Sequence, residues 1–178
     1  TSMLVANARD CYITKSLGTT FKPSAKCPVW EQFIQSVTRS HEGLASFLQR
    51  SLGYSLTGLT SQHVFWFLYG DGSNGKTTFI ETLQSLSGDY GRRASERLLT
   101  VSRNGSEAPL DELAGLPGSR FLFGSETREG ARLNEKLVKD LTGGDTIRGR
   151  MLYKAGFDFR PCGKLWLFGN HRPEICGT

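Results

Sequence analysis

The first sixty residues contain two helical patterns of hydrophobic residues, followed by a change of pattern. The first pattern places five residues on one helical face: Val29, Trp30, Phe33, Ile34 and Val37. Pro28 stands where a first helical turn accepts a proline. The second pattern repeats the spacing with Leu44, Phe47, Leu48 and Leu52, and Gly53 is expected to end that helix. We therefore predict a small helical domain over residues 27–60, preceded by an extended lead-in over residues 1–26.

From residue 61 onward, short apolar runs alternate with amphipathic helices. The runs over 63–69, 120–124 and 164–169 have the length of buried strands. Helical spacing recurs at Phe79, Ile80 and Leu83, and again at Leu133, Leu137, Val138 and Leu141 before Gly143-Gly144. Residues 88–107 are polar and predict loops with a short helix, while weak alternation over 151–159 indicates a β-hairpin. Strands alternating with helices predict an α/β domain with a largely parallel sheet.

Composition narrows the class of protein. The chain has 178 residues, which favours one main domain. No run approaches the ~20 apolar residues of a membrane helix, and no leader argues for secretion, so we expect no membrane association and a cytoplasmic location. The cysteines are scattered, which predicts free thiols in a reducing compartment: Cys11, Cys27, Cys162 and Cys176. A net charge of +5 fits a polyanionic partner and fits a chance excess of basic residues equally well.

The clearest chemical signal is the GxxxxGK[ST] pattern over residues 70–77, which follows a strand and opens a helix. In such a turn the backbone N–H groups and the helix N-terminus bind a β-phosphate. Lys76 would reach the β- and γ-phosphates, and the Thr77 hydroxyl would be a ligand of Mg²⁺. The predicted nucleotide-binding residues are Gly70, Asp71, Gly72, Ser73, Asn74, Gly75, Lys76, Thr77 and Thr78. The turn does not identify the reaction, because kinases, GTPases and motor ATPases share it.

Two further strand ends carry candidate catalytic groups. Glu126 follows the second buried strand, where a carboxylate can act as base and contact Mg²⁺. Asn170 follows the third, where an amide can orient water beside the γ-phosphate. The alternatives are an ordinary surface glutamate and a turn asparagine. Glu129 either shares the metal role or belongs to a solvated face.

Four motifs in one order carry a resemblance to a known family. They are residues 70–78, 121–126, 139–145 and 164–173. Together they resemble the superfamily 3 helicase domain of phage, plasmid and poxvirus-type primase-helicases. Residues 27–30 and 48–58 look like the small helical domain that precedes it in that family, so the resemblance covers about residues 12–178.

The resemblance implies an AAA+-type P-loop core that binds ATP and Mg²⁺ and works as a hexameric ring. Such a ring moves single-stranded or forked DNA through its pore. Lys76 and Thr77 match the Walker A motif, Ser125-Glu126 a variant Walker B motif, and Asn170 the sensor asparagine. The family's arginine finger is expected beyond Thr178 and its primase domain upstream on the same polypeptide. We therefore expect the core over 61–178 to be C-terminally incomplete and part of a longer viral, phage or mobile-element replication protein.

Basic and aromatic residues gather around the predicted hairpin. The candidate nucleic-acid contacts are Arg148, Arg150, Tyr153, Lys154 and Phe157, with Phe159, Arg160 and Lys164 nearby. Cations pair with phosphates and aromatic faces stack on bases. The resemblance places the pore hairpin in this stretch; the alternative is a solvated hairpin whose aromatic rings face the core. Arg92, Arg93 and Arg97 either touch DNA or a neighbouring subunit, or lie in a solvated loop.

The sequence leaves three functions to compare. The leading one is an ATP-dependent DNA helicase or translocase. The second is a P-loop kinase of a small metabolite, in which residues 92–103 would form the lid. The third is a non-unwinding ATP-binding module for assembly or origin binding.

Overall fold

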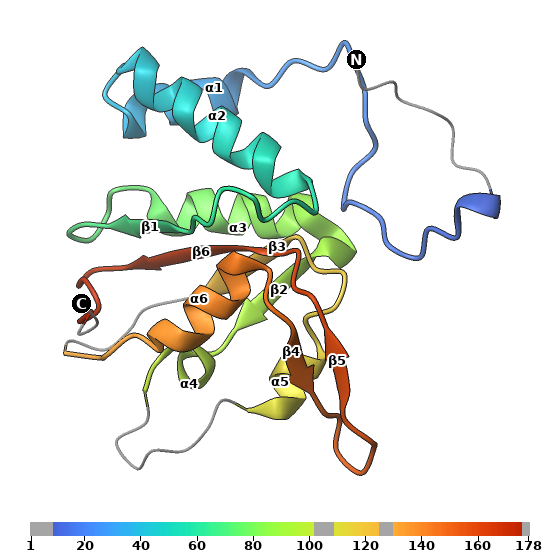
Figure 1. The fold of residues 1–178 in the computed structure, drawn as a ribbon. Coiled ribbons are helices and arrows are strands. Elements are labelled where there is room, and N and C mark those ends of the chain that lie inside the picture. The colour runs from blue at the N-terminus through green and yellow to red at the C-terminus, as the bar shows by residue number, and fades with distance from the viewer. Residues whose placement is uncertain (1–8, 102–108, 125–129, 176–178) are drawn as a thin grey trace.

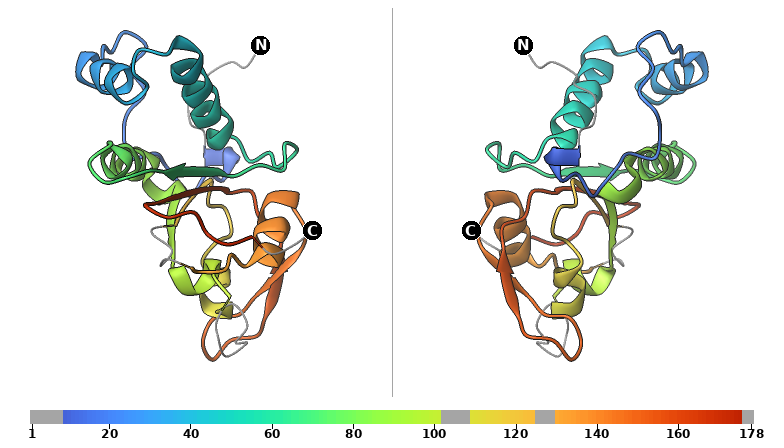
Figure 2. Two further views of the ribbon diagram at one scale, coloured as in Figure 1. Left: turned by 90° about the vertical axis from the view of Figure 1, so that its left-hand side faces the viewer. Right: turned by 90° about the vertical axis from the view of Figure 1, so that its right-hand side faces the viewer.

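The computed structural model describes residues 9–101, 109–124 and 130–175, and these form three layers (Figures 1 and 2). The middle layer is a parallel sheet that, in the described part of the chain, has the strand order β1-β6-β3-β2. Its strands are β1 (Trp66–Tyr69), β2 (Gly91–Ala94), β3 (Phe121–Gly124) and β6 (Lys164–Gly169). The mixed α/β class with a largely parallel sheet is therefore confirmed.

Three helices cover one face of the sheet: α1 (Pro28–Val37), α2 (Glu42–Leu56) and α3 (Lys76–Ser87). Alternate strand residues turn toward them because side chains along a strand point to opposite faces. The central side chain is Trp166, which is fully buried against Phe79 of α3 and Trp66 of β1. We call α1 and α2 together the helical unit.

The other face is covered by α6 (Glu135–Gly143) and the short helices α4 (Glu96–Leu99) and α5 (Leu110–Ala114). Below it projects the antiparallel hairpin of β4 (Ile147–Gly149) and β5 (Phe157–Phe159), on the side of the sheet away from the helical unit (Figures 1 and 2). The predicted hairpin is present, although its strands begin earlier and its turn is longer than the alternation indicated. It is held against α5, since the Arg150 N–H donates to the Leu110 carbonyl at 3.0 Å.

The structure corrects three local predictions. β2 lies inside a stretch predicted as loop because its two arginines are exposed and give no apolar alternation; it forms through pairing with β3. The second helix does not stop at Gly53, because its last turn is held by tertiary contacts: the indole N–H of Trp166 donates to Ser55 Oγ at 3.0 Å. That contact helps offset the roughly 1 kcal/mol that glycine costs inside a helix. The first strand begins only at Trp66, after His63 with φ +48°.

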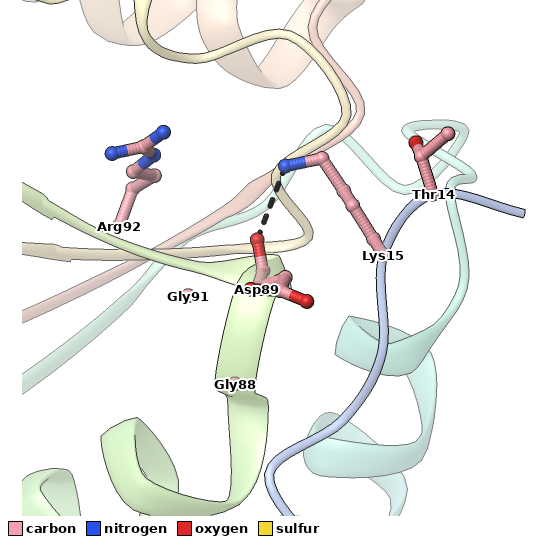
Figure 3. Close-up of a pocket in the computed structure, with 6 residues that line it drawn as sticks. All are labelled: Thr14, Lys15, Gly88, Asp89, Gly91 and Arg92. Carbon is pink, nitrogen blue, oxygen red and sulfur yellow. Dashed lines mark hydrogen bonds between the residues drawn. The ribbon is translucent and has the colours of Figure 1, made fainter.

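Apart from a short 3₁₀ turn, η1 (Arg9–Cys11), the described residues before α1 form no helix or strand. Residues 15–18 dock on the end of α3 and on η2 (Gly88–Tyr90). The Asp89 N–H donates to the Ser16 carbonyl at 3.0 Å, and the Ser16 N–H donates to the Asp89 carboxylate at 3.1 Å. The Lys15 ammonium donates to the Asp89 carbonyl at 3.1 Å (Figure 3). A polar cavity of about 460 Å³ lies between residues 14–15 of this N-terminal stretch and Arg92.

Among the described residues, no helix is long and apolar enough to span a membrane.

Lys164, at the start of β6, is only 2% exposed. Its ammonium donates to the carbonyls of Thr57 and Cys162 and lies 5.0 Å from the centre of the Tyr54 ring. Burial, together with the positive charge of Arg120, lowers the pKa of Lys164 to about 8, against a smaller opposing effect of Cys162. This buried lysine ties the end of the helical unit to the sheet and is not available to DNA, which corrects its place in the basic group around the hairpin.

The lowered pKa of Lys164 predicts a pH-dependent stability. Between about pH 8 and 10.5 the folded protein binds fewer protons than the unfolded chain, so the free energy of unfolding rises with pH. Relative to Lys164→Met, which has no group to titrate here, the wild type should therefore gain stability across this window. Urea unfolding of both proteins at a series of pH values measures the difference, with exposed Lys136→Met as the matched control. A difference that stays constant with pH would contradict the prediction.

Candidate functional site

The carboxyl ends of β1, β6 and β3 meet at one edge of the sheet, since the strands are parallel and adjacent. Tyr69 at the end of β1 is in register with Gly169 at the end of β6. The loop after β1 and the exposed Asn170 after β6 therefore start side by side. Gly124 ends β3 at the same edge, but Glu126 and Glu129 lie outside the described residues, so their predicted roles stay predictions.

The loop from Gly70 to Gly75 turns tightly between β1 and α3. Ser73 and Gly75 both adopt positive φ angles, +62° and +84°, and Gly75 is the residue before the first helical turn. A left-handed residue at this point lets the chain double back and enter the helix at once. The loop thus leads directly into the N-terminus of the twelve-residue helix α3.

The side chain of Lys76 turns back over this loop. Its ammonium donates to the Gly70 carbonyl at 2.7 Å, to Asn74 Oδ1 at 2.9 Å and to the Asp71 carbonyl at 3.3 Å. The loop therefore holds a cation beside a helix N-terminus, and both favour an anion. Thr77 and Thr78 follow in the first turn of α3 and are exposed.

A cavity of about 870 Å³ lies beside the loop, between the helical unit and β1. Residues 73–76 of the loop line one side. Most of the other lining side chains are aromatic or aliphatic, among them Phe33, Val37, Phe47 and Trp66, and Arg39 adds a cation. The helical spacing of Phe33, Val37 and Phe47 shows which face of each helix is apolar but does not show that this face leaves a space next to the loop.

The turn after β6 is held on both sides. The Arg172 guanidinium lies 4.0 Å from the centre of the Tyr69 ring and donates to the Tyr69 hydroxyl. Two residues further on, Glu174 exchanges main-chain bonds of 3.0 Å with Ala131 and Leu133. Arg172 was missed by the sequence analysis, because a basic residue after a strand gives no sign of the ring it contacts.

The predicted nucleic-acid contacts are brought together on the hairpin. Tyr153 is 97% exposed, and Lys154, Arg150 and Phe157 are also exposed. Arg148 is engaged within the hairpin, with its guanidinium 3.7 Å from the Asp158 carboxylate. Of the other basic residues considered, Arg160 is exposed beyond β5, Arg92 and Arg93 are exposed on the outer strand β2, and Arg97 is exposed on α4.

A family model describes most of this fold. Residues 68–178 match DUF5906, a family of unknown function, and the match includes the loop, β6 and the hairpin. The chain belongs to the DUF5906 family. Because this match spans more than half of the chain, family membership does not depend on any one motif.

Two viral proteins are similar to this DUF5906 chain in sequence. One is "Putative helicase L207/L206" of Acanthamoeba polyphaga mimivirus, 34% identical over 134 residues, and the other is "Putative helicase 022R" of Frog virus 3 (isolate Goorha), 29% identical over 138 residues. Each match covers 75% of this chain and 14% of the relative. The chain thus spans about a seventh of the length of these relatives.

Solved structures share the fold of this DUF5906 chain. The A form of the apo NrS-1 C-terminal region matches with a TM-score of 0.71 and 10% identity, over 92% of this chain and 37% of that one. The apo structure of residues 305–718 of the same region matches with a TM-score of 0.58 and 12% identity, over 84% and 37%. At this identity the likeness shows the fold alone.

The close packing around Gly75 leaves no room for a side chain at this position. A Cβ at this position would lie 2.7 Å from Val37 Cγ1 and 3.1 Å from Phe33, and φ is left-handed. Gly75→Ala should therefore lower the free energy of unfolding by about 1–2 kcal/mol for the left-handed backbone, and further for the clash. Gly72→Ala, in the same loop but with no atom within 4 Å of its Cβ, is the control and should be near neutral. Equal urea midpoints for the two variants would refute this packing.

Proposed function

We propose that this chain is an ATP-dependent DNA helicase or translocase domain of a viral replication protein. The viral relatives that carry helicase names indicate a helicase-related role in viral replication and imply DNA as a partner. The observation that supports ATP as the energy source is the loop of residues 70–77, whose Lys76 ammonium lies over the loop carbonyls at the edge where Asn170 also emerges.

The residues at this edge fit a nucleotide. Lys76 and the N-terminus of α3 would bind the phosphates, and the exposed Thr77 hydroxyl would hold Mg²⁺ together with Glu126. The bound Mg²⁺ would supply the charge that neutralises the phosphate oxygens. Asn170, directly after the strand that pairs with β1, would orient the attacking water, and Glu126 would accept its proton.

The hairpin supports DNA as the polymer that is moved. Tyr153 presents an aromatic ring to solvent, and Lys154 and Arg150 present cations beside it. This combination binds single strands with little sequence preference, as a translocating motor requires. The hairpin and the nucleotide edge are separate surfaces, one below the sheet and the other at its carboxyl end (Figure 1).

We further propose the architecture of this domain and the place where it works. The motifs support an AAA+-type P-loop core of superfamily 3, assembled as a hexamer, with the arginine finger and a primase domain on other parts of a longer polypeptide. The viral relatives support a viral origin and therefore a host-cell setting, for which we propose the cytoplasm.

Phosphate release with and without single-stranded DNA tests the function in the natural full-length protein. We expect DNA to stimulate release, and Lys76→Ala to reduce release to background because the loop loses its cation. The exposed Lys136→Ala, on α6, is the matched control and should behave as the wild type. Release that DNA does not change would favour a non-unwinding assembly module, and a phosphorylated small molecule as product would favour a kinase.

Changes at the hairpin tip test the DNA contact. Lys154→Ala should weaken single-strand binding and reduce the slope of log affinity against log salt by about 0.7, the value for one lost phosphate contact on a single strand. Tyr153→Ala should weaken binding by roughly 1–3 kcal/mol through lost stacking while leaving the salt slope unchanged. Binding is measured by fluorescence anisotropy at several salt concentrations. If both variants bind as the wild type does, the hairpin is not the DNA contact.

A further inference from the structure

The cavity beside the loop has no role in the function proposed so far. It lies between the helical unit and β1, and its volume of about 870 Å³ falls within the roughly 300–1,000 Å³ typical of small-molecule sites. We propose that this cavity binds the base and ribose of the nucleotide whose phosphates lie on the loop. The helical unit is then part of the nucleotide site. The proposal rests on the proposed function and adds to it the part of the ligand that the phosphate loop does not recognise.

The cavity and the loop are continuous. Residues 73–76 of the loop form one side of the cavity, so a ligand on the Lys76 ammonium extends into it without leaving the protein surface. Helix α1 lies directly on the loop, because the backbone of Gly75 packs against Val37 and Phe33. A nucleoside attached to the bound phosphates therefore meets the helical unit first.

The lining suits a flat, largely apolar ring. Phe47 and Leu44 on α2 remain 47% and 43% exposed, although both line the cavity. Apolar surface left open next to a charged loop is covered when a base stacks on it, and base–aromatic stacking tolerates any base because each has a π face. A phosphate alone would leave this surface uncovered.

The charges and hydrogen bonds of the lining agree with this ligand. Its cations are Lys76 and Arg39, and the described lining residues include no carboxylate, so the site is complementary to an anionic nucleotide. At the turn between α1 and α2 the Thr38 hydroxyl already donates to the Ile34 carbonyl at 2.7 Å. The Thr38 hydroxyl is thus already engaged, and Arg39 is the cation at this end of the cavity.

The comparison of ATP with inorganic tripolyphosphate, which has no base or ribose, tests the proposal. In the full-length protein, Phe47→Ala should weaken binding of Mg·ATP about tenfold through lost stacking and leave tripolyphosphate binding within about twofold. Phe47→Tyr keeps the ring and should restore ATP affinity. Val29→Ala, on α1 outside the cavity and 79% exposed in the wild type, is the control and should change neither.

A second measurement needs no variant. Hydrogen exchange of residues 28–56 should slow when ATP binds, because the nucleoside joins the helical unit to the loop, and should slow less with tripolyphosphate at equal occupancy. Equal protection by both ligands would overturn the base site, as would a Phe47→Ala effect that is absent or the same for both ligands.

The same binding measurements distinguish failure of the proposed function from failure of the base site alone. If the loop is the phosphate site, Lys76→Ala weakens ATP and tripolyphosphate together, whatever holds the base. A wild-type protein that binds neither ligand would overturn both proposals. One that binds both, loses both in Lys76→Ala and ignores Phe47→Ala would retain the phosphate site and overturn only the base site.

Discussion

The indole of Trp166 joins parts of the molecule that lie far apart in the chain. Its ring stacks on Trp66 with centroids 4.5 Å apart and packs against Phe79 of α3 at 5.9 Å, while its N–H bonds to Ser55 of α2. Because Trp166 belongs to β6, these contacts fix the helical unit, the strand before the loop and the helix after it relative to the strand that ends beside Asn170. Aromatic residues of this size dominate core energetics, so the site geometry depends on this cluster.

Elements whose bounds are set by residues close to them in the chain could be predicted from the sequence. β6 was predicted with its observed bounds because an apolar run is enclosed by Gly163 and Asn170, and α6 ends at Gly143 with Gly144 in the left-handed conformation. β2 and the last turn of α2 could not be predicted. They are held by β3 and by Trp166, partners that pattern analysis of a single segment does not see.

The candidate site also has one part that could be predicted from the sequence and another that could not. The spacing of Gly70, Gly75 and Lys76 predicts a phosphate loop without knowledge of the fold. The position of Asn170 beside that loop depends on strand order, because β6 lies between β1 and β3 although it follows both in sequence. The cavity, the contact of Arg172 with Tyr69 and the burial of Lys164 arise from packing between distant segments, so charge and periodicity alone misjudged or missed them.

The bonds that hold the turn after β6 have a mechanical consequence. Arg172 ties it to the end of β1, and Glu174 ties it to residues 131–133, which lead through Asn134 into α6. α6 is a stiff rod about 13 Å long, and the chain that leaves it enters β4 of the hairpin within a few residues. We therefore expect a small displacement of this turn to act on the N-terminal end of α6, whose other end lies only a few residues before the hairpin.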